Sequence, residues 1–211
     1  VDAGITHLAG VVLTHPHHDH GDGLHSVFEQ LNVDEFWVTH LDSSSLQRAL
    51  IDDAATHHVA IRTMRQGSIV ERGTARLTCL HPSAHPTRKS NDGSMVLLVE
   101  VTDDGSILLP GDLEADGEAR LRASGALRPV TVLKVAHHGS HTSTTASFLA
   151  AVRPAAAIIS VGAGNPWGHP DDPVLDRLRA LGVTVGRTDR DGAVTVTLVH
   201  GVPQLERMRR P

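Results

Sequence analysis

The sequence predicts an α/β fold in a single domain that covers residues 1–211. Short runs of Val, Ile and Leu alternate with helical patterns of about ten to fifteen residues, an order typical of a sheet flanked by helices. With 211 residues, 40% of them hydrophobic, the chain can bury one sizeable core. No repeat, low-complexity tract or long linker marks a second domain.

The expected strands are short apolar runs bounded by turn-forming residues. They cover residues 10–14, 34–38, 59–63, 75–80, 95–101, 106–109, 130–135, 155–161, 183–187 and 193–199. Asp-Asp-Gly at 103–105 predicts a hairpin turn, and Arg-Asp-Gly at 190–192 predicts another between the last two strands. Cys79 is the single cysteine and lies in an apolar run, so we expect a small buried thiol and no internal disulfide.

The expected helices follow the strands along the chain. They cover residues 22–31, 43–57, 114–123, 143–152 and 173–181. Serines 43–45 can cap the second helix, and Pro173 suits the first turn of the last one. No run reaches the ~18 apolar residues of a membrane helix and no signal peptide opens the chain, which predicts a soluble piece with no direct membrane insertion.

A metal site is predicted by the segment His-Pro-His-His-Asp-His at residues 15–20, directly after an apolar run. Side chains alternate along a strand, so His15 and His17 can grip one ion while Asp19 and His20 face a second position. Imidazole and carboxylate suit Zn²⁺, Mn²⁺ or Fe²⁺, and the lack of thiolate favours a hydrolytic metal over a structural one. The alternative is a solvated histidine loop or a structural zinc clip.

Other candidate residues come at the ends of later strands, where α/β sheets present their sites. Asp112 follows the run at 107–109 and can bridge two metals, unless it only caps the next helix. His137 and His138 follow the run at 131–135, and we expect one of them to be a metal ligand and the other to contact it or the substrate. His169 lies in the rigid segment Asn-Pro-Trp-Gly-His-Pro at 165–170, which suits a catalytic or phosphate-binding imidazole as well as a plain loop histidine.

The remaining histidines carry weaker signals. His81 or His85 can supply a third ligand to the first metal, although two prolines make their segment read equally well as a loop. The histidines that we expect on the surface or in packing are His7, His25, His40, His57, His58, His141 and His200.

The composition argues mildly against an extended nucleic-acid surface. The formal net charge is −5, so no strong basic field is present, although bound divalent ions would supply positive charge where a phosphate lies. The chain has two Trp, three Phe and no Tyr. Base stacking would therefore depend on Trp37, Trp167 or a phenylalanine.

These motifs resemble those of the metallo-β-lactamase superfamily, whose His-x-His-x-Asp-His signature is present at His15, His17, Asp19 and His20. More narrowly, the chain is similar to the carboxy-terminal hydrolase domain of the ComEC competence proteins over nearly its whole length. The matching segments are residues 13–20, 91–97, 109–112, 133–140, 159–162, 165–170 and 187–189. The segments His-His-Gly-Ser at 137–140 and Asn-Pro-Trp-Gly-His-Pro at 165–170 narrow the resemblance to this group.

The resemblance implies an αββα sandwich with the metal site at one edge of its two sheets. Two departures from the ComEC pattern stand out. That group usually has an aspartate where His17 stands, and its opening strands, with a Gly-Gln-Gly-Asp segment, would lie before Val1. We therefore expect a fragment of a longer, membrane-bound protein that lacks its first N-terminal strands.

For the activity, the resemblance implies a metal-dependent phosphodiesterase, a nuclease that contacts DNA through its phosphate backbone during competence. One or two divalent ions, Zn²⁺ or Mn²⁺, would activate water for attack on phosphorus. Asp19 would orient that water or take its proton, Asp112 would bridge the metals, and His137 or His138 would complete the second site. The residues expected to hold phosphate oxygens or protonate the leaving group are Lys134, Ser140 and His169. The domain would then degrade the strand that is not taken up, outside the cytoplasmic membrane and attached to the membrane-embedded remainder of the parent protein.

Two alternatives stay open. The superfamily uses the same ligands to hydrolyse small esters, lactones, thioesters and phosphodiesters, and a non-catalytic coupling module of an uptake channel would need no metal. A narrow apolar pocket would favour a small substrate. A basic track would favour a polymer, and its candidate residues are Arg62, Arg65, Lys134, Arg153 and Arg187.

Overall fold

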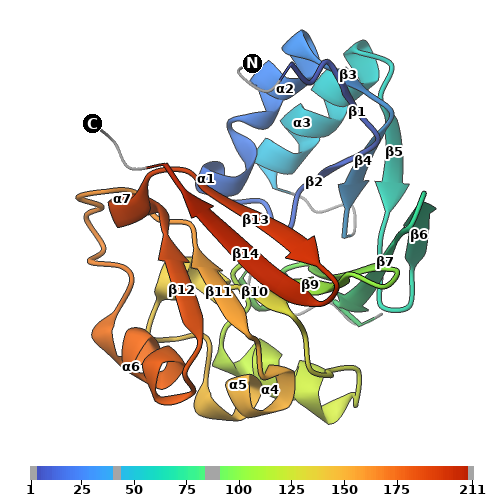
Figure 1. Cartoon of the computed structure of the whole chain (residues 1–211). Helices are drawn as coiled ribbons and strands as arrows, with labels where there is room; N and C mark the ends of the chain where they lie inside the picture. The colour runs from blue at the N-terminus through green and yellow to red at the C-terminus, as the bar shows by residue number, and fades with distance from the viewer. Residues whose placement is uncertain (1–3, 40–43, 84–90, 209–211) are drawn as a thin grey trace.

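The computed structural model describes residues 4–39, 44–83 and 91–208 and stacks them as helices, sheet, sheet and helices (Figure 1). Helices α2 (Leu24–Gln30) and α3 (Ser45–Thr56) cover one side of the molecule. Helices α4 (Ala115–Ala123), α5 (Ala146–Val152) and α6 (Asp172–Ala180) cover the opposite side. The α/β sandwich expected from the sequence is confirmed.

The larger sheet has seven strands and mixed direction. Its order is β12 (Thr184–Arg187), β11 (Ala156–Ile159), β10 (Val132–Lys134), β9 (Gly105–Leu109), β8 (Val96–Val101), β7 (Ala75–His81) and β6 (Ile69–Arg72). Strands β9 to β12 run parallel, whereas β6 to β9 pair in antiparallel fashion. The carboxyl ends of β9, β10 and β11 therefore meet at one edge of the sheet, where parallel sheets bind their ligands.

The smaller sheet is parallel throughout and carries the first histidine motif. Its order is β2 (Val11–Val12), β4 (Glu35–Val38) and β5 (Ala60–Thr63), with a separate parallel pair β1 (His7–Leu8) and β3 (Asn32–Val33) beside the same helices. Helix α3 is capped by Ser44, whose Oγ accepts the backbone N–H of Gln47 at 3.5 Å. Ser43 lies outside the described residues.

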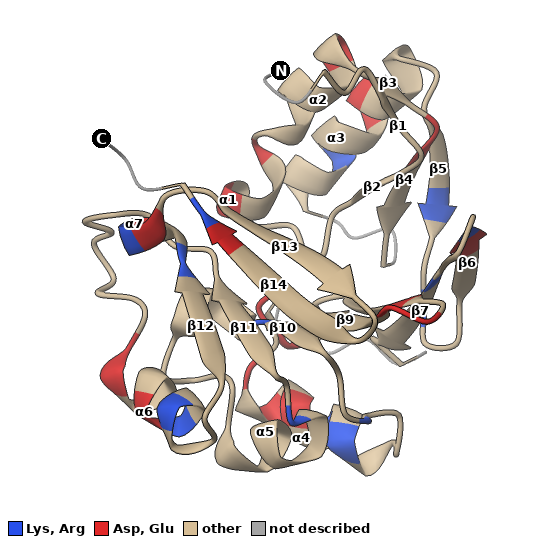
Figure 2. Cartoon of the chain, in the orientation of Figure 1, with Lys and Arg blue, Asp and Glu red and all other residues tan. Residues whose placement is uncertain are grey.

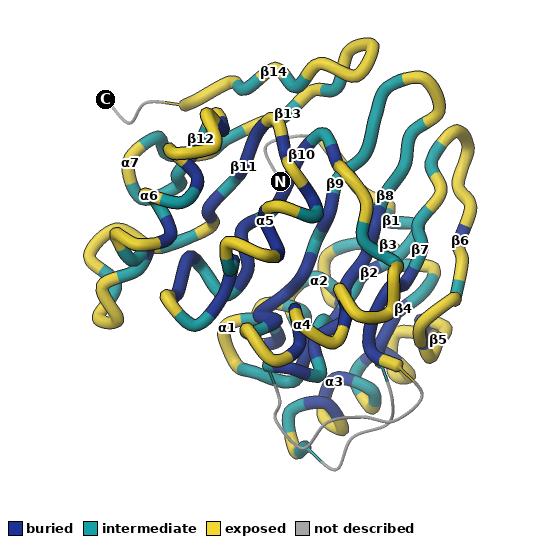
Figure 3. The backbone as a smooth tube through the Cα atoms, turned by 90° about the horizontal axis from the view of Figure 1, so that it is seen from below, coloured by how far each residue is buried: buried dark blue, intermediate teal, exposed yellow. Residues whose placement is uncertain are grey.

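Three apolar clusters join the four layers, because neighbouring residues of a strand face opposite ways. Phe36 packs with Leu50 of α3, while its neighbour Trp37 packs with Met95 between the two sheets. The third and largest cluster lies between the seven-stranded sheet and α4, α5 and α6, and Leu133 is fully buried in it. Figure 3 shows this buried interior and the exposed outer strand β6.

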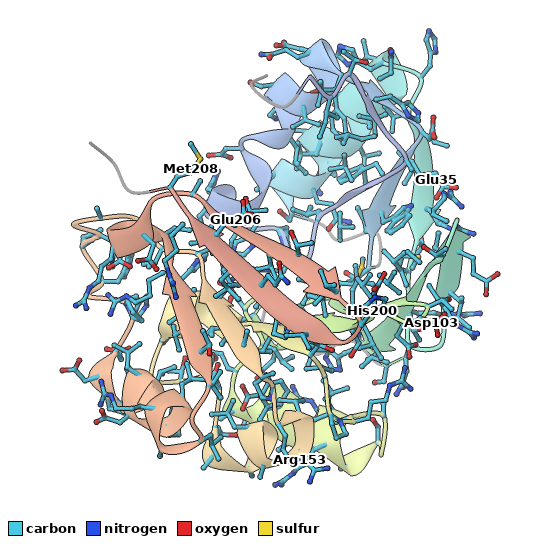
Figure 4. All side chains as sticks on the ribbon, viewed as in Figure 1. Glu35, Asp103, Arg153, His200, Glu206 and Met208 are labelled. Atoms are coloured by element: carbon cyan, nitrogen blue, oxygen red, sulfur yellow. The ribbon has the colours of Figure 1, made fainter. Side chains whose placement is uncertain are left out.

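A C-terminal hairpin, β13 (Val194–Val199) with β14 (Val202–Arg207), lies across the outer part of the larger sheet (Figure 1). Gly186 of β12 lets the hairpin approach, because a Cβ there would lie 2.9 Å from Val194 Cγ1. At the tip, the backbone N–H of His200 donates to Asp104 Oδ1 at 3.1 Å, next to Asp103 in Figure 4.

Several local expectations need correction. Residues 190–192 form no hairpin turn, because β12 pairs in parallel with β11 and is followed by the short helix α7 (Thr188–Asp191). Strand β13 pairs instead with β14, which was not expected, and β6 was also missed. The helix expected at 22–31 is α2, whereas the short helix α1 (His18–Gly21) before it was not expected. The hairpin turn at 103–105 and the position of Pro173 in the first turn of α6 are confirmed.

The cysteine and the helix lengths can also be compared with expectation. Cys79 is fully buried, as expected, and burial raises the pKa of its thiol to about 12. Among the helices in the described ranges, none is long and apolar enough to cross a membrane.

Candidate metal centre

The first arm of the site is the loop between β2 and α1, which carries the histidine motif. Thr14 Oγ1 lies 3.1 Å from Nδ1 of His15 and 3.4 Å from Nδ1 of His20. Because the hydroxyl engages the Nδ1 side of both rings, their Nε2 atoms are free to face the site. The His15 side chain is 1% exposed and that of His20 is 14% exposed, so both imidazoles are held at a fixed orientation by packing.

The second arm is the turn that follows β9 and ends at Asp112. Gly111 has φ +59°, and a Cβ there would lie 3.0 Å from Ser94 Cβ and 3.1 Å from Thr14 Cβ. A glycine is therefore needed where the turn passes between these residues. Ser94 Oγ accepts the backbone N–H of Asp112 at 3.1 Å. Asp112 does not cap α4, because that helix begins at Ala115 with Glu114 in the capping position.

The third arm is a left-handed turn after β10, the 3₁₀ segment η2 (Ala136–Gly139). His137 and His138 have φ of 48° and 53°, values that non-glycine residues rarely adopt. The turn is held at its far end, where Asp171 donates its backbone N–H to the carbonyl of Gly139 at 2.9 Å. His138 donates from Nδ1 to the carbonyl of Ser160 at 2.7 Å, so its Nε2 faces the other arms.

These arms bring four ligand atoms, from Asp19, His20, Asp112 and His138, within 4.8 Å of one another. His20 Nε2 lies 3.2 Å from Asp112 Oδ1 and 3.3 Å from His138 Nε2. His138 Nε2 lies 3.3 Å from Asp19 Oδ2. Ligands of a tetrahedral zinc ion lie about 3.3 Å apart, since zinc bonds to nitrogen and oxygen are about 2.0 Å long. The spacing therefore fits one divalent ion.

Three imidazoles lie on the other carboxylate oxygen of Asp112. The Nε2 atoms of His15, His137 and His138 are each 3.8 Å from Asp112 Oδ2. The ring of His17 lies edge-on to that of His15, with their centroids 4.4 Å apart. Asp112 thus has His20 beside one oxygen and these histidines beside the other, an arrangement that suits a bridging carboxylate.

The electrostatics keep these groups in the forms that bind cations. Burial, with help from the neighbouring His20, lowers the pKa of His15 to about 3, so this imidazole is neutral. Burial alone would raise the pKa of Asp112, but its hydrogen bond with His20 and the nearby imidazoles outweigh burial and lower it. Asp112 is therefore an ionised carboxylate at neutral pH.

The donor set fits a divalent cation. His15 Nε2 is buried without a hydrogen-bond partner among the described residues, which is costly unless something else satisfies it. Imidazole nitrogens and carboxylate oxygens are the donors that zinc, manganese and iron accept. The residues that could hold such ions are His15, His17, Asp19, His20, Asp112, His137 and His138.

Lys134 and Ser140 lie beneath the site. Nζ of Lys134, at the end of β10, is inaccessible to solvent and has no hydrogen-bond partner among the described residues. Burial lowers the pKa of Lys134, whereas the charges of Asp112 and Asp19 oppose that shift. Ser140 Oγ is engaged by Thr142, whose Oγ1 lies 3.0 Å away.

His169 reaches the site from the loop after β11. Asn165 holds this histidine by its backbone, accepting its N–H at 3.0 Å and donating to its carbonyl at 2.7 Å. The imidazole lies with Nδ1 3.3 Å from Asp171 Oδ2 and with its centroid 5.9 Å from that of His137. The structure therefore brings His169 to the edge of the second histidine group.

The other histidines lie apart from the cluster. His81 donates from Nε2 to the carbonyl of Asp92 at 2.9 Å, a structural hydrogen bond, and His85 lies outside the described residues. His18, although inside the first motif, is exposed and pairs with Asp22. The expected surface histidines have partners of their own or face solvent, except His40, which lies outside the described ranges. Those described are His7, His25, His57, His58, His141 and His200.

Three supporting residues were not predicted from the sequence: Thr14, Glu114 and Asp171. Glu114 Oε1 lies 3.4 Å from His137 Nδ1. Asp171 accepts the backbone N–H of His141 at 2.6 Å besides facing His169. Each lies within two residues of a predicted site residue, and that adjacency is the one signal that could have found them.

A cavity of about 750 Å³ lies at the ends of β11 and β12, and none of the residues that line it belongs to the metal cluster. Val161, the residue after the Ser160 carbonyl that holds His138, lines it together with Thr188 and Met208. The candidate basic track is not continuous (Figure 2), since Arg62 pairs with Glu35 and Arg187 with Asp189.

Comparison with known proteins identifies relatives over most of the chain. Residues 2–163 match the model of the family described as "Metallo-beta-lactamase superfamily". ComE operon protein 3 of Bacillus subtilis is 32% identical over 196 residues, 90% of this chain and 25% of that protein. Competence protein ComA of Neisseria gonorrhoeae is 38% identical over 62% of this chain and 19% of its own length. Recombination protein 2 of Haemophilus influenzae is 40% identical over 62% of this chain and 16% of its own length. The chain thus spans a quarter or less of these relatives, which are ComEC-type competence proteins.

Solved structures agree on the fold. The diiron β-hydroxylase CmlA from Streptomyces venezuelae covers 96% of this chain with a TM-score of 0.59 and 11% identity, over 45% of its own length. Zn²⁺-bound PqqB from Methylobacterium extorquens covers 85% of the chain with a TM-score of 0.54 and 15% identity, over 71% of its length. At these identities the likeness concerns the fold alone.

Proposed function

The chain belongs to the metallo-β-lactamase superfamily, and from that premise we propose that it is a metal-dependent phosphodiesterase that cleaves DNA during competence. The observation that carries the proposal is the clustering of Asp19, His20, Asp112 and His138 from three separate arms of the fold. Superfamily membership supports a metal-dependent hydrolase, and the competence relatives support DNA as its substrate.

In this proposal a bound divalent ion such as Zn²⁺ or Mn²⁺ would supply activation of water and neutralise charge on the substrate. Asp19, His20, Asp112 and His138 would hold one ion, and His15, His17 and His137 would hold a second with the help of Asp112. The side chain of Asp19 is 59% exposed, so its carboxylate can accept a proton from the attacking water. The carboxylate of Asp112 is 2% exposed, which suits a purely ligating role.

Residues around the cluster serve the phosphate group. His169, held through its backbone by Asn165, binds a phosphate oxygen or protonates the leaving oxygen. Lys134 contributes its charge from beneath the site, because its Nζ is inaccessible to solvent. Ser140 supports the histidine turn by donating its backbone N–H to the carbonyl of His137 at 2.8 Å, and in this proposal its hydroxyl binds phosphate.

The cellular setting follows from the relatives. The chain corresponds to 25% or less of each competence protein named above, so we propose that it works attached to a larger, membrane-embedded remainder. In that setting the domain faces outward from the cytoplasmic membrane and degrades the strand that is not taken up. The DNA contacts it through the phosphate backbone, attracted by the bound ions rather than by a basic surface.

The test is cleavage of end-labelled single- and double-stranded DNA by protein stripped of metal and then resupplied with Mn²⁺ or Zn²⁺. Cleavage should return with metal in the wild type and be absent in Asp19→Ala and His138→Ala. The control is His18→Ala, because His18 lies in the same motif but points to solvent, where it pairs with Asp22. Full activity in both cluster variants would contradict the proposal.

A second candidate, hydrolysis of a small ester, lactone, thioester or phosphodiester, is favoured by the broken basic track. The same metal-loaded preparation should then hydrolyse small chromogenic esters and leave DNA intact. A preparation that binds no metal and cleaves neither substrate would favour a non-catalytic coupling module.

A further inference from the structure

One aromatic ring of this chain is available to a ligand. The other four are buried in the core, with exposed fractions of 4% or less: Phe28, Phe36, Trp37 and Phe148. Trp167 is 74% exposed. Covering such an indole with a flat apolar surface removes it from water, and this burial is favourable.

The loop that carries Trp167 is built to present it. Asn165 bonds the backbone N–H and the carbonyl of His169, and so closes a ring of residues around the tryptophan. Asn165 also donates from Nδ2 and from its backbone N–H to the carbonyl of Gly162, at 3.1 and 3.3 Å. The loop turns at Gly168, whose φ of +73° favours glycine. A ring on such a closed loop loses little conformational freedom when it binds.

The same loop is anchored to the metal centre. Trp167 stands two residues before His169, whose ring packs edge-on to His137. Two residues after His169, Asp171 donates its backbone N–H to Gly139 at the end of the histidine turn. The exposed indole therefore belongs to the rim of the site rather than to a distant surface.

The surroundings of Trp167 argue for a planar ligand. Its neighbours along the loop at 164–170 are glycines, prolines, an asparagine and a histidine, so the loop itself adds no second large apolar side chain beside the indole. Stable protein interfaces bury about 800 Å² on each partner around a hydrophobic centre, which a lone ring does not supply. A nucleobase needs one aromatic face, and stacking accepts every base.

We propose that Trp167 stacks on the base of an unpaired nucleotide next to the phosphodiester held at the metal centre. This inference rests on the proposed function and narrows its substrate class to single-stranded DNA or a frayed strand end. Bases inside a duplex already stack on each other and leave no free face for the indole. The metal centre would bind the phosphate and Trp167 would select for an accessible base.

The first experiment compares two oligodeoxynucleotides of equal length, one with bases and one made of abasic residues. Trp167→Ala should raise the KM for the base-bearing strand about 5- to 100-fold, the range of a lost base–aromatic contact. Trp167→Phe should restore most of the affinity, and the abasic strand should be cleaved equally by all three proteins. An equal loss on both strands, or no loss on either, would overturn the proposal.

The second experiment needs no cleavage. The chain has two tryptophans, and Trp37 is buried between the sheets, so a bound strand that stacks should quench the fluorescence of Trp167 alone. In Asp19→Ala protein supplied with Mn²⁺, which should not cleave, we expect quenching by the base-bearing oligonucleotide, little by the abasic one, and none once Trp167→Phe is added. Absence of quenching, or equal quenching by both strands or by anionic phospholipid vesicles, would overturn the stacking role.

The two experiments separate this inference from the proposed function. If the metal-loaded wild type cleaves no DNA but base-dependent quenching is seen, the nuclease proposal fails and the stacking site stands. If DNA is cleaved and neither KM nor fluorescence depends on the base, the nuclease proposal stands and the stacking site fails.

Discussion

At the scale of single residues, the centre depends most on Asp112, whose Oδ1 faces His20 and whose Oδ2 faces three further histidines: His15, His137 and His138. The Asp112 side chain is only 2% exposed, so water could not take the place of its carboxylate if the charge were removed by substitution. The Asp112 carboxylate therefore sets both the charge of the centre and the spacing of the histidines around it.

We expect Asp112→Asn to lower the affinity for Zn²⁺ and Mn²⁺ by more than about 100-fold, beyond what loss of a ligand's hydrogen-bond partner costs. The amide keeps the size of the side chain but removes its charge and one acceptor oxygen. Competition with a chromogenic chelator measures the affinity. Asp22→Asn is the control, because Asp22 pairs with the exposed His18 outside the cluster; equal affinities in the two variants would rule out the bridging role.

His81 makes a second prediction, about acid stability. Burial lowers the pKa of His81 in the folded protein below its usual value near 6.5. Between the folded and the unfolded pKa, His81 is protonated in the unfolded chain and neutral in the folded one. Stability is therefore lost as the pH falls through about 6.5. His81→Gln, whose amide can still donate to Asp92, should lose less stability between pH 7 and pH 5.5 than the wild type.

Urea unfolding of EDTA-treated protein at the two pH values measures this difference. An unchanged slope of free energy against urea would show that both proteins unfold the same surface. If wild type and His81→Gln lose the same stability between pH 7 and pH 5.5, His81 is not the group responsible for the loss.

The residue types of the site could be predicted from the sequence better than their grouping. The motif at 15–20 and the strand ends at 112 and 137–138 do meet, because strand alternation and parallel topology bring them to one edge. That His18 turns outward and that His137 faces a different oxygen of Asp112 from His20 depends on φ values of single residues, which no local pattern reveals. His81 was misleading because a buried histidine and a metal ligand look alike in sequence.

At the scale of elements, the important contact joins the histidine turn to the loop after β11. Gly139 has φ +87°, and a Cβ there would lie 2.5 Å from Pro170 Cβ and 3.1 Å from its Cα. The turn and the loop can meet only because residue 139 has no side chain.

We expect Gly139→Ala to destabilise the fold by about 1–3 kcal/mol more than Gly182→Ala, through overpacking against Pro170. Gly182 has a similar φ of +68°, but a Cβ there would meet nothing within 4 Å, so its variant isolates the backbone strain. Thermal unfolding of the two variants measures the difference, and metal affinity should fall only in Gly139→Ala. Equal melting temperatures would show that the turn and the loop can separate at little cost.

The elements themselves were largely predictable where apolar runs were long. Strand β8 and helix α3 have strong periodicity and lie close to their expected bounds. Strand β6 was missed because three of its four residues are exposed, and β14 because Pro203 and two charged residues interrupt its alternation. Both pair with a neighbour through backbone bonds, which side-chain patterns do not record.

At the scale of the whole molecule, the site connects two halves of the chain. Asp19 and His20 follow the smaller sheet, whereas Asp112 and His138 follow strands of the larger one. The two sheets otherwise contact each other through a modest apolar cluster around Trp37 and Met95. A bound ion would therefore cross-link the layers.

We expect a divalent ion at a free concentration 100 times its Kd to stabilise the folded protein by about 2.7 kcal/mol. The shift should be visible as a higher melting temperature, and hydrogen exchange should slow in both the 15–31 segment and the 137–140 turn. Asp112→Asn should show neither change. Protection confined to one of the two segments would mean that the ion is held by one half alone.

The hydrogen bond from His138 to the carbonyl of Ser160 has a consequence for the uptake of the ion. A neutral imidazole exists as two tautomers, and a carbonyl can accept only from the one that carries its proton on Nδ1. Ser160 therefore selects this form before any cation arrives and leaves the lone pair of Nε2 directed at Asp19 and Asp112. In this tautomer the ring needs no rearrangement to bind an incoming ion, so the backbone directly after β11 prepares the ligand in advance.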